Sequence, residues 1–413
     1  MYDVIIVGAR CAGSPLGMLL ARSGRRVLVV DRATFPSDTV STHFIQQTGI
    51  ALLRDWGVLE AATGNAHPIR HMTASFKDLL ISGFADPIDG IDRVYAPRRT
   101  VMDAALLEAA VDAGAEVRQG YTVEELIVAD DRVVGIRGRA AGGRLHEERA
   151  AVVVGADGAN STVARLTGAA VYNHVPAACF IYYSYFAGLD WNDFHHRTGD
   201  FQQMGAWPTN DGLHLVAVMR KRDRFAAFRA APAETFAEIV DTVTPDLGAD
   251  LRARGERVAP LQPMLYPDNY YRQAAGPGWA LVGDAGYHKD PYTGNGIADA
   301  FRHAGHLAET LHANLDRGPA AVDAALKEYG EYRDEESAQT YEFTCTISEL
   351  ELPQRIYDAF DASSRSQKYR LEFFRMMAGA MPGHEFFAPD RLERMYREVG
   401  FVPAGAVSPN GGH

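Results

Sequence analysis

The feature that most constrains this chain is a glycine turn directly after its first apolar segment. Val4 to Val7 form a short apolar run that predicts a buried strand, and the turn Val7-Gly8-Ala9-Arg10-Cys11-Ala12-Gly13 opens a stretch with leucines at helical spacing. A second β-branched run ends at Asp31, about 20 residues further on. Strand, glycine turn, helix and second strand in this order predict a βαβ unit that binds a dinucleotide.

The turn residues have separate physical roles in such a unit. Gly8 permits a tight turn, and Gly13 lets the helix pack close to the strand. The start of the helix, at Cys11 and Ala12, offers free N–H groups and a partial positive charge to a pyrophosphate. We expect Asp31 to accept hydrogen bonds from ribose hydroxyls and include its neighbour Arg32 among the cofactor contacts.

Arg10 stands where the middle glycine of the fingerprint is expected. Its side chain could obstruct the approach of the backbone to phosphate, or it could lie over the pyrophosphate as a counter-charge. A structural βαβ turn without a ligand is the alternative for the turn taken alone.

Two further segments have the character of nucleotide-binding loops. Val154-Gly155-Ala156-Asp157-Gly158 follows a short buried strand, and Val282-Gly283-Asp284-Ala285-Gly286 is the second segment. The second continues to Pro291, Gly294, Asn295 and Gly296 and ends at a stretch with helical apolar spacing.

Together with the first turn, these segments resemble the three fingerprints of the para-hydroxybenzoate hydroxylase-like FAD family, which includes aromatic hydroxylases, flavin halogenases and geranylgeranyl reductases. The resemblance covers residues 1 to 315 and implies FAD as the cofactor. It implies that Asp284 binds a ribityl or ribose hydroxyl, and that Asp157 lies near FAD. It also implies contacts with the flavin from the following four residues: Pro291, Gly294, Asn295 and Gly296.

Two more residues take roles from the same resemblance. Arg99 resembles the arginine that contacts the flavin at the start of a helix, although the adjacent Arg98 is an open alternative. His43 falls where family members approach the flavin ring, and it is the candidate catalytic residue. It could donate a hydrogen bond, act as acid or base, or carry the flavin covalently, whereas a histidine that is simply hydrogen-bonded is the alternative.

The sequence predicts an α/β fold with an α+β insertion: a Rossmann-like FAD-binding domain, an inserted antiparallel β-sheet substrate domain and a helical C-terminal segment. The expected FAD-binding domain comprises residues 1–75, 95–170 and 275–318. Residues 76–94 and 171–274 form the expected sheet domain. Residues 319–413 form the helical segment, which could cap the pocket or contribute to a homodimer and which ends in a Gly/Pro-rich, flexible tail from Ala404.

The resemblance implies flavin chemistry that needs little from side chains beyond placement. We expect a monooxygenase that hydroxylates a small organic substrate with O₂ through a flavin C4a-hydroperoxide, and NADPH or NADH as the reductant. An aromatic or polyketide-like compound of secondary metabolism is the expected substrate. Tyr183, Tyr185 and Trp207 are the candidate pocket residues; Tyr182 takes the opposite strand face, and packing in the core is the alternative for all of them.

Proteins with this type of fold have three other functions that this chain could have. A geranylgeranyl reductase-like enzyme acting on C=C bonds is the main alternative. Halogenases of the family carry a W-x-W-x-I-P motif, which the four tryptophans do not form. A non-catalytic carrier of lipidated partners is disfavoured by the intact Asp284 and Gly294-Asn295-Gly296 elements.

Composition limits the partners of this 413-residue chain. A formal net charge of −12 without a basic run disfavours nucleic acid and anionic membranes. Cys11, Cys179 and Cys345 are far apart and odd in number, so we expect neither a disulfide framework nor a metal site. The chain starts in a strand pattern and has no bilayer-length apolar run, so a soluble, cytoplasmic protein is expected.

Overall fold

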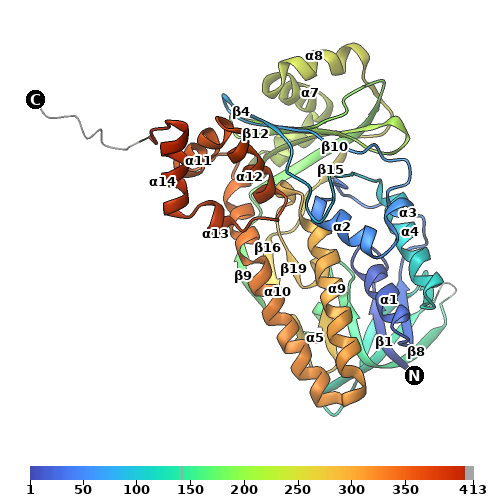
Figure 1. Ribbon diagram of the computed structural model, residues 1–413. Coiled ribbons are helices and arrows are strands. Elements are labelled where there is room, and N and C mark those ends of the chain that lie inside the picture. Colours follow the sequence, from blue (N-terminus) through green and yellow to red (C-terminus); the bar gives the residue numbers. More distant parts are fainter. Residues whose placement is uncertain (141–142, 405–413) are drawn as a thin grey trace, which may run out of the picture. The chain divides into compact units, whose positions relative to one another are not determined.

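The computed structural model describes residues 1–140 and 143–404, and the chain divides into two compact units (Figure 1). Unit 1 comprises Met1–Ala66, Tyr95–Ala177 and Tyr266–Ala338. Unit 2 comprises His67–Val94, Ala178–Leu265 and the chain from Gln339 onwards. Residues 405–413 of the expected flexible tail lie outside the described residues.

Unit 1 is built on a parallel sheet with the order β18-β8-β1-β2-β5. Its strands are β1 (Tyr2–Val7), β2 (Val27–Asp31), β5 (Glu116–Gln119), β8 (Leu145–Gly155) and β18 (Trp279–Leu281). The antiparallel strands β6 (Thr122–Ala129) and β7 (Arg132–Arg139) extend from β8, and β17 (Ala275–Gly276) pairs with β18. The helices of this unit are α1 (Gly13–Arg22), α2 (Gln47–Asp55), α3 (Leu59–Thr63), α4 (Arg99–Asp112), α5 (Thr162–Thr167) and α9 (Gly296–Asn314).

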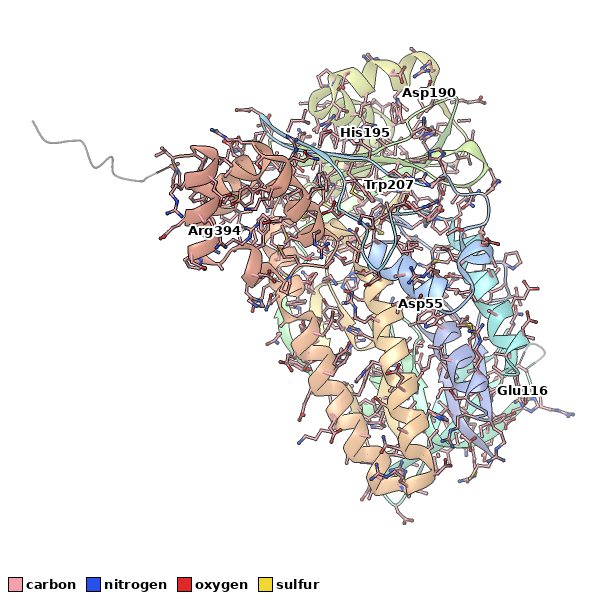
Figure 2. The ribbon with its side chains drawn as sticks, in the orientation of Figure 1. Asp55, Glu116, Asp190, His195, Trp207 and Arg394 are labelled. Carbon is pink, nitrogen blue, oxygen red and sulfur yellow. The ribbon has the colours of Figure 1, made fainter. Side chains whose placement is uncertain are left out.

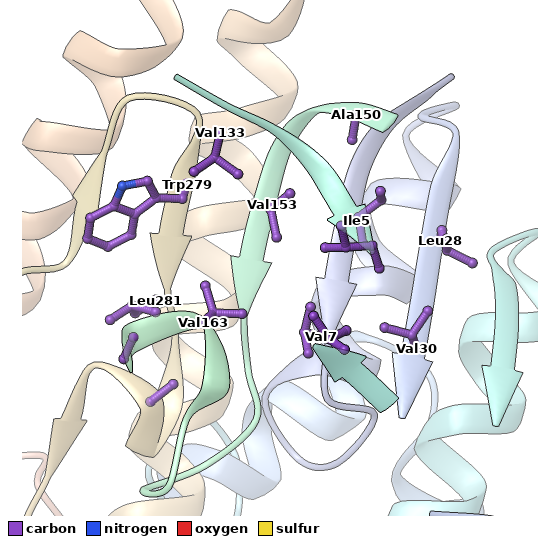
Figure 3. Packing of buried hydrophobic residues seen from close by; sticks show 14 of the residues in the cluster. Ile5, Val7, Leu28, Val30, Val133, Ala150, Val153, Val163, Trp279 and Leu281 are labelled. Atoms are coloured by element: carbon purple, nitrogen blue, oxygen red, sulfur yellow. The ribbon is translucent and has the colours of Figure 1, made fainter. Parts of the chain in front are cut away.

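The strands of this sheet are buried on both faces, as parallel sheets are. On one face, Ile5, Val7, Leu28, Val30 and Val153 pack with side chains from β7, α5 and β18 in one apolar cluster (Figure 3). Their neighbours Val4, Ile6 and Val29, which point the other way, are also fully buried. The short β-branched runs of the sequence are therefore continuous core strands.

A small second sheet in unit 1 changes the expected boundary of the inserted domain. It has the order β19-β16-β9 and is formed by β9 (Val171–Val175), β16 (Asn269–Arg272) and β19 (Tyr287–His288). Residues 171–177 and 266–274 thus belong to unit 1, although the sequence placed them in the sheet domain. An aromatic, alternating texture predicts strands but does not reveal which sheet each strand joins.

Unit 2 contains an inserted sheet, with the order β14-β10-β13-β12-β11-β3-β4 and with β15 on β10. Residues 67–75, which the sequence placed in the FAD-binding domain, belong to this unit. All its pairings are antiparallel except that of β3 with β11. The strands are β3 (Met72–Phe76), β4 (Leu79–Gly83), β10 (Cys179–Ala187), β11 (Phe194–Gly199), β12 (Gln202–Pro208), β13 (His214–Lys221), β14 (Glu256–Arg257) and β15 (Gln262–Met264). The helices α6 (Phe225–Ala230), α7 (Pro232–Val243) and α8 (Pro245–Arg254) follow β13.

The C-terminal segment is helical, as expected, but it is not a unit of its own. The long helix α10 (Pro319–Ile347) begins in unit 1 and continues into unit 2. The remaining helices α11 (Gln354–Ser364), α12 (Gln367–Met377), α13 (Gly383–Phe386) and α14 (Pro389–Val399) lie in unit 2. There, Phe360 of α11 packs on Phe76 of β3. The predicted α/β fold with an inserted sheet is confirmed.

Within residues 1–140 and 143–404, no helix combines the length and the apolar character that crossing a bilayer requires.

The apolar cluster under one face of the unit 2 sheet predicts a large stability loss on truncation. The Phe228 ring stacks on the Tyr182 ring at 4.3 Å between centroids and is almost fully buried. We expect Phe228→Ala to lower the free energy of unfolding by about 3–5 kcal/mol, because it removes buried area and leaves a cavity. Chemical denaturation measures this loss. The control Phe201→Ala, at an exposed phenylalanine, should change stability by about 0.5 kcal/mol or less; equal effects at both sites would contradict the packing.

Candidate cofactor site and the open face of the sheet

Three loops of unit 1 meet at the carboxyl ends of β1, β8 and β18. A Cβ atom on Gly8, whose φ is 107°, would lie 2.3 Å from the Ala156 carbonyl oxygen. A Cβ on Gly283 would lie 2.9 Å from the Cβ of Ala12, and the N–H of Val282 donates to the Gly155 carbonyl at 2.9 Å. In open α/β sheets, ligands bind outside this end of the strands.

Glycines at these loops leave the backbone accessible, which suits the close approach of a dinucleotide. A Cβ on Gly158 or Gly296 would have no neighbouring atom within 4 Å. The Asp284 side chain is exposed although its neighbours Gly283 and Ala285 are buried. An exposed carboxylate beside open backbone glycines suits the hydroxyl groups of a ribityl or ribose chain.

The N-terminal residues of α1 and α9 lie at the loops described above. The side chains of their N-cap residues, Ala12 and Asn295, do not cap the first turn of either helix. Gly296, the first residue of α9, is exposed. Uncapped amide groups and the positive end of the helix dipole together favour an anion, such as a pyrophosphate at α1 or a negative charge on the flavin pyrimidine at α9.

Asp31 fixes the first turn to the end of β2. Its Oδ2 accepts from the backbone N–H of Ala9 at 2.7 Å, and its Oδ1 accepts from that of Ala33 at 2.8 Å. A carboxylate has about four lone-pair sites, so both oxygens can still accept from a ribose. The next residue, Arg32, is exposed. The contacts of both residues with the cofactor stay predictions.

The guanidinium of Arg10 has protein partners, and its relation to a pyrophosphate stays a prediction. The guanidinium donates to Asp103 Oδ2 at 2.7 Å and to Ser37 Oγ at 2.9 Å, and it lies over the Phe35 ring at 5.2 Å. The side chain is therefore held by α4 and by the segment after β2. The sequence motifs gave no indication of a role for Asp103.

Asp103 is fully buried and is shared by two arginines. Besides Arg10, Arg99 pairs with it at 3.0 Å, one helical turn away on α4. Burial alone lowers the pKa of Arg99, but the Asp103 carboxylate outweighs burial and raises it. Arg99 also donates to Cys11 Sγ at 3.6 Å, whereas burial raises the pKa of this thiol to about 11. At neutral pH the group therefore holds two cations, one carboxylate and a protonated thiol.

Asp157 is engaged with the helix that follows it. Its carboxylate accepts from Ser161 Oγ at 2.5 Å and from the backbone N–H groups of Thr162 and Val163 at the start of α5. Burial raises the pKa of Asp157, and these donors oppose the rise. The carboxylate thus orders the loop that carries Gly158, and its expected proximity to FAD stays a prediction.

His43 is fully buried and has a positive φ of 62°. Its chain segment lies beside the loop before α9: Gln46 donates to the Thr293 carbonyl at 3.1 Å, and a Cβ on Gly294 would lie 2.9 Å from Phe44. Burial, with the charges of Arg99 and Arg98, lowers the pKa of His43 to about 3. The imidazole is therefore neutral at physiological pH.

The remaining candidates lie on the loop before α9. Pro291 is partly exposed, and the Asn295 side chain is buried and donates to the Thr293 carbonyl at 3.4 Å. The neighbouring Asp290 is buried and accepts from the Tyr266 hydroxyl at 2.6 Å; burial raises its pKa to about 7. Sequence reasoning did not identify Asp290, because its burial is not visible in the motif.

In unit 2, the sheet has two different faces. Tyr182, Met204 and Val218 pack with the phenylalanines of α6 and α7. The alternate residues form three cross-strand rows on the opposite face. These rows are Tyr185-Leu215-Trp207-Phe194, Tyr183-Ala217-Gly205-His196 and Ile181-Met219-Gln203-Thr198. We call this the open face, meaning the face opposite α6 and α7; its side chains, except that of the half-buried Phe194, are themselves buried. Tyr183, Tyr185 and Trp207 share it, and Trp207 is labelled in Figure 2.

The open face is aromatic and uncharged. The Trp207 ring stacks on Phe194 at 4.9 Å and reaches over Gly205, whose Cβ would lie 2.8 Å from it. Burial lowers the pKa of His196 to about 4, so this imidazole is neutral at pH 7. Gln203 is 8% exposed, and its Oε1 has no hydrogen-bond partner among the described residues. Sequence reasoning missed Gln203, although strand alternation from Trp207 would have placed both on one face.

Comparison with known proteins identifies the family. A family model described as FAD binding domain matches residues 1–344, and the chain belongs to this family. A digeranylgeranylglycerophospholipid reductase of Methanosarcina mazei is 29% identical over 339 residues, which are 78% of this chain and 77% of the relative.

Solved structures share the fold. The flavin-dependent brominase Bmp2 superposes with a TM-score of 0.81 at 19% identity, over 97% of this chain and 98% of that one. PqsL of P. aeruginosa, in complex with 2-aminobenzoylacetate, gives 0.74 at 20% identity, over 90% and 99%. The resemblance to the para-hydroxybenzoate hydroxylase-like group is confirmed, and the protein is an FAD-dependent oxidoreductase.

The neutral, buried state of His43 predicts a pH dependence of stability. Its pKa is lower in the folded protein (about 3) than the ordinary value of 6.5, so the unfolded state binds the proton first as the pH falls. Between pH 6.5 and 5 this costs about 2 kcal/mol of unfolding free energy. Asparagine tolerates the positive φ at this position. Between pH 7 and pH 5, the free energy of unfolding of His43→Asn, measured with urea, should therefore fall by about 2 kcal/mol less than that of the wild type. The exposed control His67→Asn should leave the loss unchanged; an unchanged loss in His43→Asn would contradict a neutral buried imidazole.

Proposed function

We propose that the protein is an FAD-dependent monooxygenase that hydroxylates a small, flat, uncharged organic substrate, with NADPH or NADH as the reductant and O₂ as the oxidant. Bound FAD would supply the redox chemistry, held by the three loops of unit 1 and by the N-termini of α1 and α9. The open face of the unit 2 sheet would bind the substrate. Aromatic, including polyketide-like, compounds of secondary metabolism fit this description.

The composition of the open face carries the proposal. Its middle row has small residues at Ala217 and Gly205, between Tyr183 and a neutral His196. Flat aromatic surfaces flank this row at Tyr185 and Trp207. A planar apolar molecule gains offset or edge-on contacts with such rings, whereas a carboxylate would lose its hydration without a cation to pair with.

The chain's own polar groups suit a dry site. His43 is neutral, so it can orient a polar group through a hydrogen bond without adding a charge. Asp290, whose pKa burial raises to about 7, can hold a proton at Oδ1 or Oδ2 near neutral pH. Flavin hydroxylation requires the protein to place the substrate and to exclude water, so this reaction class does not need a strong acid–base pair.

A reductase or dehydrogenase acting on C=C bonds is the second candidate. The 29% identity to the Methanosarcina mazei reductase favours it. Its hydride transfer would be indifferent to O₂, whereas hydroxylation consumes one O₂ for each substrate molecule.

One cuvette experiment separates these functions. The purified protein should be yellow, bleach on addition of NADPH or NADH without oxygen, and recolour in air. Oxygen uptake should rise with a neutral phenol as the probe and should not rise with its carboxylated counterpart. Reduction of an isoprenoid C=C bond under anaerobic conditions, with no substrate-stimulated oxygen uptake, would support the reductase instead. Precipitation with acid shows whether the flavin stays attached, which tests His43 as an anchor.

Gln203 provides a test of the open face. Its buried acceptor Oε1 has no partner among the described residues, and such an atom costs about 1–3 kcal/mol. We expect Gln203→Leu to raise the Tm of the free protein and to weaken binding of the phenol probe by about tenfold, because the substrate hydroxyl loses its acceptor. Thermal unfolding and a binding titration measure the two effects.

The matched control is Gln202→Leu, at the adjacent glutamine, which points to the other face of β12. It should leave binding of the probe unchanged. A lower Tm for Gln203→Leu with unchanged binding would show that Gln203 is structural and that the open face does not bind substrate through it.

A further inference from the structure

Three side chains behind the cofactor loops of unit 1 hold the carbonyl groups of those loops. Tyr270 and Arg272 lie on β16, two residues apart and therefore on the same side of the strand. Arg333 lies on α10. The two loops that they contact are residues 157–161, after β8, and residues 283–286, after β18; we call them the DG loop and the GD loop.

Arg272 joins the two loops directly. Its NH1 group donates to the Ala285 carbonyl of the GD loop at 2.9 Å, and its NH2 group donates to the Ala159 carbonyl of the DG loop at 3.0 Å. The guanidinium also lies over the Tyr270 ring at 4.3 Å from the centroid. Because both nitrogens belong to one rigid, planar group, they fix the separation of the two carbonyl oxygens.

Tyr270 makes the same connection through its hydroxyl. The hydroxyl oxygen lies 2.7 Å from the Asp284 carbonyl and 3.3 Å from the Ala159 carbonyl, so the proton is directed mainly to Asp284. Burial, and then the nearby Asp284 carboxylate, raise the pKa of Tyr270. The hydroxyl therefore stays a donor throughout the physiological pH range.

Arg333 holds the end of the GD loop and the backbone of β16. It is 1% exposed, donates to the Gly286 carbonyl at 3.0 Å and donates to the Arg272 carbonyl at 2.9 Å. Its remaining partners are the Tyr172 hydroxyl and the Asp334 carboxylate. Each of the three guanidinium nitrogens of Arg333 thus donates at least one hydrogen bond, so this buried group rigidifies what it contacts.

The consequence is a fixed orientation of successive peptide groups. The carbonyl oxygens of Asp284, Ala285 and Gly286 are all occupied by these three side chains, while the Asp284 side chain is exposed. We propose that Tyr270, Arg272 and Arg333 act as a clamp that sets both loops in the FAD-binding conformation before the cofactor binds. This inference rests on FAD binding by unit 1 and is independent of whether the reaction is hydroxylation or reduction.

The clamp makes physical sense because loops are costly to order. Fixing the backbone of one residue costs about 1–2 kcal/mol of conformational entropy, and a protein that orders two loops on binding loses this from the affinity. The glycines of these loops lack Cβ atoms, so they are the residues with the most freedom to lose. Side chains outside the glycine motif can order these loops through their carbonyl groups and leave the glycines accessible to the ligand.

The experiment compares two clamp variants with a matched control. Tyr270→Phe removes only the hydroxyl, and Arg272→Lys keeps the charge but cannot span two carbonyls. Arg132→Lys is the control: Arg132 is also a partly buried arginine of unit 1 that donates to a carboxylate and a carbonyl, on β7. Hydrogen–deuterium exchange is measured on the full chain after removal of flavin, followed by titration with FAD.

In both clamp variants, amides of residues 157–161 and 283–287 should exchange faster, while the rest of the parallel sheet keeps its protection. The Kd for FAD should rise by about tenfold, mainly through slower association, and the Tm of the flavin-free chain should match that of the control. Unchanged loop exchange and unchanged Kd would overturn the clamp. A lower Tm with loss of protection throughout unit 1 would show that Tyr270 and Arg272 are merely structural.

The exchange measurement and the FAD titration also distinguish a failure of the clamp from a failure of the FAD assignment. If the wild-type chain took up no FAD, the cofactor assignment would fail, and with it the proposed function and the clamp's role. If the wild type binds FAD but its flavin-free loops already exchange as fast as those of Arg272→Lys, the clamp alone fails.

Discussion

The architecture of unit 1 depends on a direct contact between backbones at the ends of β1 and β8. A Cβ on Gly13 would lie 1.8 Å from the Gly8 carbonyl oxygen, and one on Gly8 would clash with the peptide between Ala156 and Asp157. No side chain fits in either place, so the start of α1 can approach the strand ends only through glycine. This approach brings the N-terminus of α1 beside the DG and GD loops.

Much of this arrangement could be predicted from the sequence because it is local. A β-branched run, a glycine turn and an apolar helical stretch each restrict a few neighbouring residues, and their order restricts the topology. The three loops could also be predicted to meet, because strands of a parallel sheet share their carboxyl ends. Tyr183 and Tyr185 could be placed on one strand face by alternation, which the register of β10 with β13 bears out.

The parts that could not be predicted depend on contacts far apart in the chain. Arg10 and Asp103 are separated by 93 positions, and Arg333 reaches Gly286 over 47 positions. Nothing in the local pattern around Arg333 marks it, except that it continues a helical stripe with Tyr329 and Ser337, two residues that are also buried. The division of residues 171–177 and 266–274 from the inserted sheet likewise depends on strand partners and not on local propensity.

The buried charges around the candidate site explain how an acidic protein can hold an anionic cofactor. The whole chain carries a formal charge of −12, but at the first turn two arginines share the single carboxylate of Asp103. Arg272, behind the two loops, donates to carbonyl oxygens. These cations, together with the positive ends of α1 and α9, offset part of the negative charge that the carboxylates of Asp31, Asp157 and Asp284 place at the same loops.

Arg10, which departs from the glycine fingerprint, is one of these cations. Its guanidinium is held by Asp103 and Ser37, so the side chain holds a positive charge at a fixed position beside the first turn. The Asp103 carboxylate also pairs with Arg99, so one buried anion fixes both arginines.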